Sequence, residues 1–185
     1  DMEEEDAAWA VAEAVKLRAV LEDFVAQPAG LPSRSAAVRR ALRRLGSLSL
    51  SKEAIRGVHV GRAAHKLAEC GVAEVASDAI ALCDMWRSLL RDGPLSDFSW
   101  AEAKLRLDPT AEAVEWLVNL EPVLSWGGPE RELLERAGRT LKAVSAREGC
   151  SSLVQALAAS ALSNWEAKGQ VVVGLRDDLL REATG

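Results

Sequence analysis

The sequence has 185 residues, of which 49% are hydrophobic and 28% are charged, with a formal net charge of −5. This length suits one domain or two small ones, each with a buried core. The acidic balance argues against a dedicated nucleic-acid-binding protein, which would carry a large basic surface. No apolar run approaches the roughly 20 residues of a membrane-spanning helix, and the acidic start DMEEED is unlike a secretory signal.

Residue types that support catalysis, metal binding or disulfide formation are sparse. The three cysteines and two histidines match neither metal-site spacing nor a disulfide framework. We therefore expect a reducing compartment, no metal and no cofactor. No P-loop, dinucleotide-binding or catalytic-triad motif is readable, so we expect that the protein is not an enzyme. Because the sequence begins with Asp1, we also expect it to be part of a longer protein.

The residue pattern predicts an all-α fold. Tyrosine is absent, β-branched residues are few, and alanine and leucine dominate. A first helix with a broad apolar face is expected over residues 6–26, ending before Pro28. A second helix follows, with Ser33 or Ser35 as its N-cap. Its apolar stripe consists of Val38, Ala41, Leu42 and Leu45.

Three further helices are expected at 52–56, 63–69 and 72–90, the first with Ser51 as N-cap. Three motifs thus follow one another along the chain. They are a Leu-x-x-Leu pair, a Gly-Arg dipeptide and an alanine-rich helix that ends in Trp-Arg. The residues of this pattern are Leu42, Leu45, Gly61, Arg62, Leu67, Ala79, Leu82, Trp86 and Arg87.

The pattern resembles the N-terminal domain of the transcription elongation factor TFIIS. With the added first helix, residues 1–92 are also similar to the integrase-binding domain of lens epithelium-derived growth factor. The resemblance implies a compact right-handed bundle of four to five short helices that holds short disordered motifs of other nuclear proteins. Those motifs carry a bulky apolar anchor with acidic neighbours.

The resemblance also implies where the partner binds, in a pocket between the loops 29–33 and 69–72. The residues that it implies for partner binding are Gly30, Leu31, His65, Lys66, Cys70 and Val72. Cys70 stands where the growth-factor type has an aromatic residue, and Glu69 replaces a basic one. We therefore expect a shallower, less basic pocket and a different bound motif, unless Cys70 is simply a small buried residue.

The segment RDGPLSD, residues 91–97, is expected to separate the bundle at 1–92 from a second helical bundle at 93–185. In the second bundle, Asp108 is expected to cap a helix that begins at Pro109 and is kinked at Pro122. The remaining expected helices are 130–136, 139–147, 151–167 and 175–182.

The second bundle is interpreted as a possible diverged copy of the first. Residues 61–86 and 138–165 both open on Gly-Arg, pass a Gly/Cys break and close on a tryptophan at the end of an alanine-rich helix. The alternative is a chance similarity between two alanine-rich helices.

Two sets of side chains remain as candidates for binding. Arg39, Arg40, Arg43 and Arg44 are expected to form one exposed basic face, either merely solvated or a dock for an acidic peptide or a nucleic-acid backbone. Among the six tryptophans, Trp86 and Trp165 are expected in the core, as are Trp9 and Trp116. Trp100 and Trp126 lie beside chain breaks and are expected to be half exposed, at the joint between the halves or in a groove.

These observations predict a non-enzymatic interaction module of a nuclear transcription-elongation or chromatin factor, a scaffold that binds disordered motifs of partner proteins. A structural assembly or dimerisation domain is the main alternative. Nucleic-acid binding through the arginine face is a weaker one, because the chain is acidic.

Overall fold

The computed structural model describes residues 1–170 of the chain. Every regular element in that range is a helix, which confirms the predicted all-α class. The chain divides into two compact units: unit 1 comprises residues 1–91, and unit 2 begins at Asp92. This division falls at the segment 91–97, where the sequence analysis placed the boundary. The expected helix at 175–182 lies outside the described residues.

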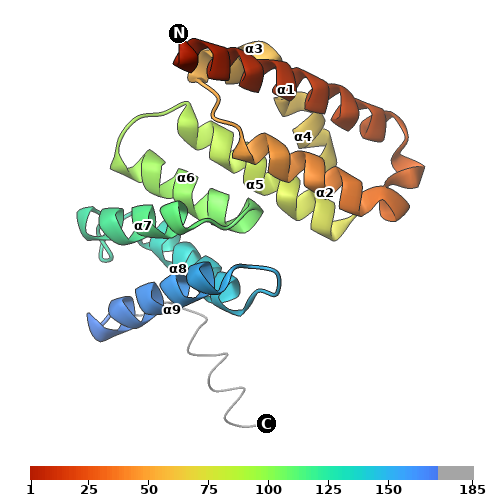
Figure 1. Cartoon of the computed structure of the whole chain (residues 1–185). Coiled ribbons are helices and arrows are strands. Elements are labelled where there is room, and N and C mark those ends of the chain that lie inside the picture. The colour runs from red at the N-terminus through yellow and green to blue at the C-terminus, as the bar shows by residue number, and fades with distance from the viewer. Residues whose placement is uncertain (171–185) are drawn as a thin grey trace. The chain divides into compact units, whose positions relative to one another are not determined.

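Unit 1 is a bundle in which α1 lies along α2, α3 and α4, while α2 and α4 both pack on α5 (Figure 1). Its elements are α1 (Met2–Ala26), the 3-10 turn η1 (Pro28–Gly30), α2 (Leu31–Ser47), α3 (Lys52–Val58), α4 (Gly61–Ala68) and α5 (Ala73–Leu89). The predicted stripe of α2 is buried in full and forms the centre of the core with Leu67, Leu82 and Trp86.

Local signals set most of the helix ends in unit 1. Pro28 ends α1, and the Ser51 hydroxyl accepts a hydrogen bond from the Ala54 N–H at 3.1 Å to cap α3, both as predicted. The prediction that Ser33 or Ser35 caps α2 is wrong. The turn η1 runs directly into α2, whose first turn contains proline, and Ser33 instead donates to the Gly30 carbonyl at 3.0 Å.

Unit 2 packs α6 on α7 and α8, and α9 on α7 and α8. Its described elements are α6 (Pro94–Leu107), α7 (Ala111–Leu120), the 3-10 turn η2 (Glu121–Val123), α8 (Arg131–Ala146) and α9 (Ser152–Ala167). The core consists of apolar residues from all four α-helices, with Phe98, Leu117, Leu141 and Trp165 among the largest.

Three local predictions in unit 2 are corrected. Thr110, whose hydroxyl accepts from the Ala113 N–H at 3.3 Å, caps α7 in place of Asp108. Helix α7 ends at Leu120, so Pro122 lies in η2 and kinks no helix. The helices expected at 130–136 and 139–147 are one helix, α8. It continues through Gly138 because its apolar stripe does, with Leu134, Ala137, Leu141 and Val144 all buried.

The two stretches compared as a possible repeat share their second part only. Gly71 and Gly149 both have positive φ, at 80° and 86°, in the break before the alanine-rich helix, and Trp86 and Trp165 are both buried near the end of that helix. Gly61, in contrast, begins α4, whereas Gly138 lies inside α8. The diverged copy therefore stays a prediction.

A buried carboxylate links α6 to α8 in unit 2. The Glu102 side chain is fully buried, and its Oε1 lies 2.9 Å from Arg106 Nε and 3.3 Å from Arg136 Nε. The Thr140 hydroxyl donates to the same oxygen at 3.0 Å. A buried charge is tolerated only with such partners, because it has lost its hydration.

We predict that Glu102→Gln lowers the free energy of unfolding of unit 2 by about 2 kcal/mol, because the side-chain shape is kept while two guanidinium groups lose their counter-charge. Amide hydrogen exchange, which reports each helix separately, should show lower protection in α6 and α8. Glu115→Gln on the exposed face of α7 is the matched control and should change stability by less than about 0.5 kcal/mol. Equal protection in the two variants would contradict the prediction.

Candidate functional site

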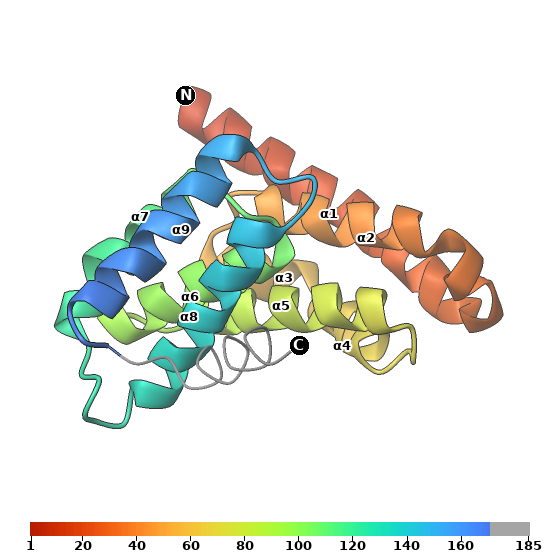
Figure 2. The ribbon, with the colours of Figure 1, turned by 90° about the horizontal axis from the view of Figure 1, so that it is seen from below.

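The loops that the family resemblance implicates lie at the same end of unit 1 (Figures 1 and 2). Leu31, which the resemblance implies for partner binding, is buried in the core, so its side chain does not face a partner. Gly30 is half-buried, with the guanidinium of Arg34 against it. That guanidinium also lies 4.6 Å from the centre of the Phe24 ring. The turn between α1 and α2 is therefore covered by packing of its own.

The other residues implied for partner binding lie on α4 and the turn that follows it. His65 and Lys66 are exposed, and His65 Nε2 lies 3.6 Å from Glu69 Oε1. Cys70 and Val72 are half-buried, and Cys70 Sγ lies 3.8 Å from the Val72 carbonyl oxygen. This turn thus presents a small polar surface, and whether it binds a partner stays a prediction.

The four arginines of the predicted basic face have different surroundings. Arg39 Nε lies 3.0 Å and Arg43 Nε 3.7 Å from Oδ2 of Asp78, a buried carboxylate on α5. Arg44 Nε lies 3.7 Å from Glu13 Oε1 on α1, and Arg40 is exposed. Arg40 and Arg44 are exposed, whereas Arg39 and Arg43 are half-buried beside Asp78, so the expected exposed face is present only in part. Phosphate recognition would have to displace these carboxylates.

The tryptophans fall into a buried and a partly exposed group. Trp86 and Trp165 are buried, as predicted. Trp100 and Trp126 are half-buried, also as predicted; Trp100 packs on Trp116, and Trp126 packs on Trp165, with ring centres 5.1 and 5.6 Å apart.

Trp9 and Trp116 are not core residues, contrary to the prediction, since 54% and 38% of their surfaces are exposed. Each precedes a buried residue, Ala10 or Leu117, and successive helix residues point about 100° apart. Both indoles therefore lie at the edge of the buried face of their helix.

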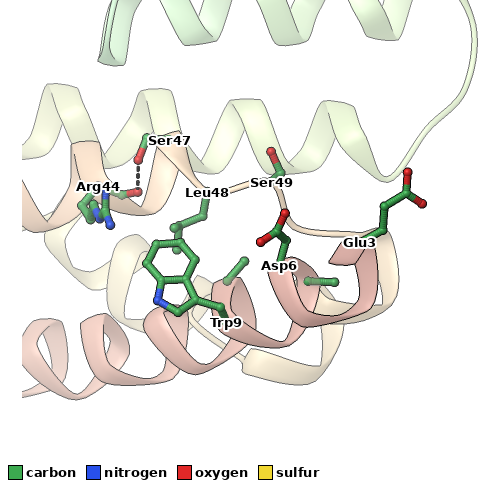
Figure 3. Close-up of a pocket in the computed structure, with 9 residues that line it drawn as sticks. Glu3, Asp6, Trp9, Arg44, Ser47, Leu48 and Ser49 are labelled. Atoms are coloured by element: carbon green, nitrogen blue, oxygen red, sulfur yellow. Dashed lines mark hydrogen bonds between the residues drawn. The ribbon is translucent and has the colours of Figure 1, made fainter. Parts of the chain in front are cut away.

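A groove of about 430 Å³ lies beside Trp9, between α1 and the end of α2. We call it the Trp9 groove. Its lining residues are Glu3, Asp6, Ala7, Trp9, Ala10, Arg44, Ser47, Leu48 and Ser49. Figure 3 shows the Trp9 ring and Leu48 in the middle of the groove, Asp6 and Glu3 toward one end, and Arg44 toward the other.

The local sequence explains this shape. Helix α2 ends at Ser47, and Leu48 adopts an extended conformation, so that the chain leaving α2 forms one wall. Ala7 and Ala10 on α1 are small side chains that leave space beside the indole. The sequence analysis missed Glu3, Asp6 and Leu48. The signal that was present is an isolated tryptophan, Trp9, two alanines after the acidic run DMEEED.

The two ends of the groove differ in charge. At one end the Arg44 guanidinium lies 5.4 Å from the centre of the Trp9 ring, close enough for a cation–π contact, and it also faces Glu13. At the other end, Glu3 and Asp6 form no ion pair or side-chain hydrogen bond with any residue from 1 to 170. The groove therefore combines an exposed aromatic surface with two acidic groups that have no counter-charge in that part of the chain.

Unit 2 carries a smaller hollow of about 260 Å³, lined by Asp97, Trp116, Asn119 and Leu120. Trp116 is its aromatic wall, backed by Trp100. This hollow has one carboxylate and fewer lining residues than the Trp9 groove. It is therefore the second candidate for a binding surface.

Two side chains in the described part of the chain have a pKa shifted by burial. Burial raises the pKa of the Cys83 thiol, and the nearby Arg87 guanidinium offsets only part of that rise, so Cys83 is a weak nucleophile at neutral pH. Burial likewise lowers the pKa of Lys104, against the opposing effect of Asp108 and Glu112. Within residues 1–170, no group of three or more His, Cys, Asp or Glu side chains could hold a metal ion, and no helix is long and apolar enough to cross a membrane.

Comparisons with protein-family models, with curated proteins and with solved structures give no match to this chain. The likeness to the TFIIS N-terminal domain therefore rests on the sequence pattern alone.

We predict that Trp9→Ala costs about 1 kcal/mol of stability, the value of its cation–π contact with Arg44, whereas Trp86→Ala costs about 3–5 kcal/mol through loss of a buried side chain. Urea denaturation followed by far-UV circular dichroism measures both. Similar costs for the two variants would place Trp9 in the core and contradict the groove.

Proposed function

We propose that this chain is a non-enzymatic protein-interaction module that binds a short peptide segment of a partner protein in the Trp9 groove. The observation that carries the proposal is the position of Trp9, 54% exposed on a helix and beside a groove lined by Leu48 and two alanines. Aromatic residues in such settings contribute a large share of binding energy at protein interfaces.

The size of the groove supports a peptide ligand. Sites that bind small ligands typically measure about 300–1,000 Å³, and the Trp9 groove, at about 430 Å³, has room for one or two side chains. It is flanked by α1 and α2, whose packing is fixed by core residues such as Leu42 and Leu45. A preformed groove binds a disordered segment without unfolding the bundle, and only the segment loses conformational freedom.

The family resemblance supplies the biological setting of the proposal. By that resemblance the module belongs to a nuclear transcription-elongation or chromatin factor and recognises disordered motifs of other nuclear proteins. The proposed site, however, lies near the start of α1, whereas the loop 29–33 follows its end. About 20 helical residues separate the two, or roughly 30 Å at 1.5 Å per residue, so a bound peptide distinguishes them.

A second function, self-assembly of a structural helical domain, would use exposed apolar side chains of unit 2. These side chains lie on several elements, and exposed apolar groups mark protein contacts where they gather into a patch. They are Leu95, Trp116, Val118, Val123 and Leu153.

The test is an amide-shift NMR titration of the full ¹⁵N-labelled chain with ten-residue peptides that each carry one Leu, Phe or Trp anchor. We expect shifts of the Trp9 indole N–H and of amides in 3–10 and 44–49, because these groups line the groove. Trp9→Ala should abolish the shifts, and the matched variant Trp116→Ala in unit 2 should retain them.

Two other outcomes decide against this site. Shifts confined to 29–33 and 69–72 would place binding at the loops that the family resemblance implies. No shift with any peptide, together with a mass that rises with protein concentration in light scattering, would favour the assembly domain.

A further inference from the structure

We infer that the Trp9 groove selects a peptide in which a lysine or arginine accompanies an apolar anchor. This inference rests on the proposed function and specifies its ligand. It is the reverse of the ligand class that the family resemblance implies, in which acidic residues flank the anchor.

The middle of the groove accepts the anchor. The Trp9 ring and Leu48 lie there, and the small side chains of Ala7 and Ala10 also line the groove. These surfaces contain no buried charge, so an aliphatic or aromatic side chain fits them without losing a hydrogen bond. The exposed part of Trp9 is then covered by the ligand, which supplies the hydrophobic part of the affinity.

The Arg44 end of the groove offers little attraction to an acidic ligand. Its guanidinium already faces the Glu13 carboxylate, at 3.7 Å, and the Trp9 ring. An acidic peptide residue would have to compete with Glu13 for the same group. Arg44 also repels a basic residue, so it directs the positive charge of the ligand to the opposite end.

The opposite end attracts a basic side chain. Glu3 and Asp6 both line the groove and have no ion pair among residues 1–170. Glu4 and Glu5 in the same turn add to the negative potential. Acidic residues at the start of a helix are also stabilised by the helix dipole. That effect explains the charges themselves but not their position in the lining of a groove. Here two carboxylates lie beside an exposed tryptophan, and charge complementarity across such a site selects among partners.

The geometry sets the spacing within the ligand. Asp6 and Glu3 precede Trp9 by three and six residues on α1, or about 4.5 and 9 Å along the helix axis at 1.5 Å per residue. An extended peptide advances about 3.3 Å per residue. The basic residue is therefore expected one to three positions from the anchor.

The experiment compares three ten-residue peptides with one leucine anchor and, two positions away on each side, lysine, serine or glutamate. Binding to the chain of residues 1–185 is measured from the shifts of the Trp9 indole N–H and of the amides in 44–49, and the amide shifts also report binding to Trp9→Ala. We expect the lysine peptide to bind about tenfold more tightly than the glutamate peptide, which corresponds to about 1.4 kcal/mol. This preference should shrink when the salt concentration is raised, because exposed charges are screened.

Two double variants separate a specific effect from a general one. Glu3→Gln with Asp6→Asn removes both carboxylates from the groove lining, whereas Glu4→Gln with Glu5→Gln removes two negative charges from the start of the same helix outside the lining. The first pair should abolish the lysine preference and leave serine-peptide binding unchanged. The second should retain most of the preference.

The outcomes distinguish this inference from the proposed function. If all three peptides bind with equal affinity and Trp9→Ala abolishes binding, the charge selection is wrong and the interaction module stands. A preference for the glutamate peptide, or a lysine preference that both double variants weaken equally, also overturns the inference. If no peptide shifts the indole signal, the proposed function fails and the inference fails with it.

Discussion

Each unit of this protein contains a buried carboxylate that faces at least one arginine of a neighbouring helix. In unit 1, Asp78 on α5 binds Arg39 and Arg43 on α2. In unit 2, Glu102 on α6 faces Arg136 on α8. Apolar stripes alone permit helices to slide or rotate with little change in buried area. A dehydrated carboxylate does not, because only one arrangement returns its lost hydrogen bonds. We therefore regard these pairs as the constraint that fixes how the helices of each unit meet.

The same pairs decide which surfaces remain for binding. Asp78 faces Arg39 and Arg43 of α2, so these two basic residues link α2 to α5, and Arg44 lies beside Glu13 of α1. One edge of α1 is exposed. The alanines Ala10 and Ala14 face the core, whereas Trp9 at this edge is exposed. The proposed interaction site follows from this arrangement: a poorly covered helix edge beside the chain that leaves α2. Its acidic end lies in the first turns of α1, where negative charge is also compatible with the helix dipole.

Sequence patterns that act within one or two helical turns predicted their structures well. The all-α class, the stripe Val38–Leu45, the caps at Ser51 and the burial of Trp86 and Trp165 all appear in the structure. Each depends on residues three or four positions apart, or on one side chain and the adjacent backbone. The errors at Ser33 and Asp108 are also local, because a neighbouring turn or a competing cap changed the helix start by a few residues.

The sequence by itself thus determined that the protein is helical, where most helices lie and which stripes are apolar. Only the tertiary structure decided that Arg39 binds Asp78, 39 positions away, and that Trp9 is exposed beside Leu48. It also decided that Leu31, one of the residues implied for partner binding, is buried in the core. The physical reason is that helical periodicity fixes the direction of a side chain relative to its own helix. Whether that direction meets solvent, a carboxylate or another apolar face depends on helices that are distant in the chain.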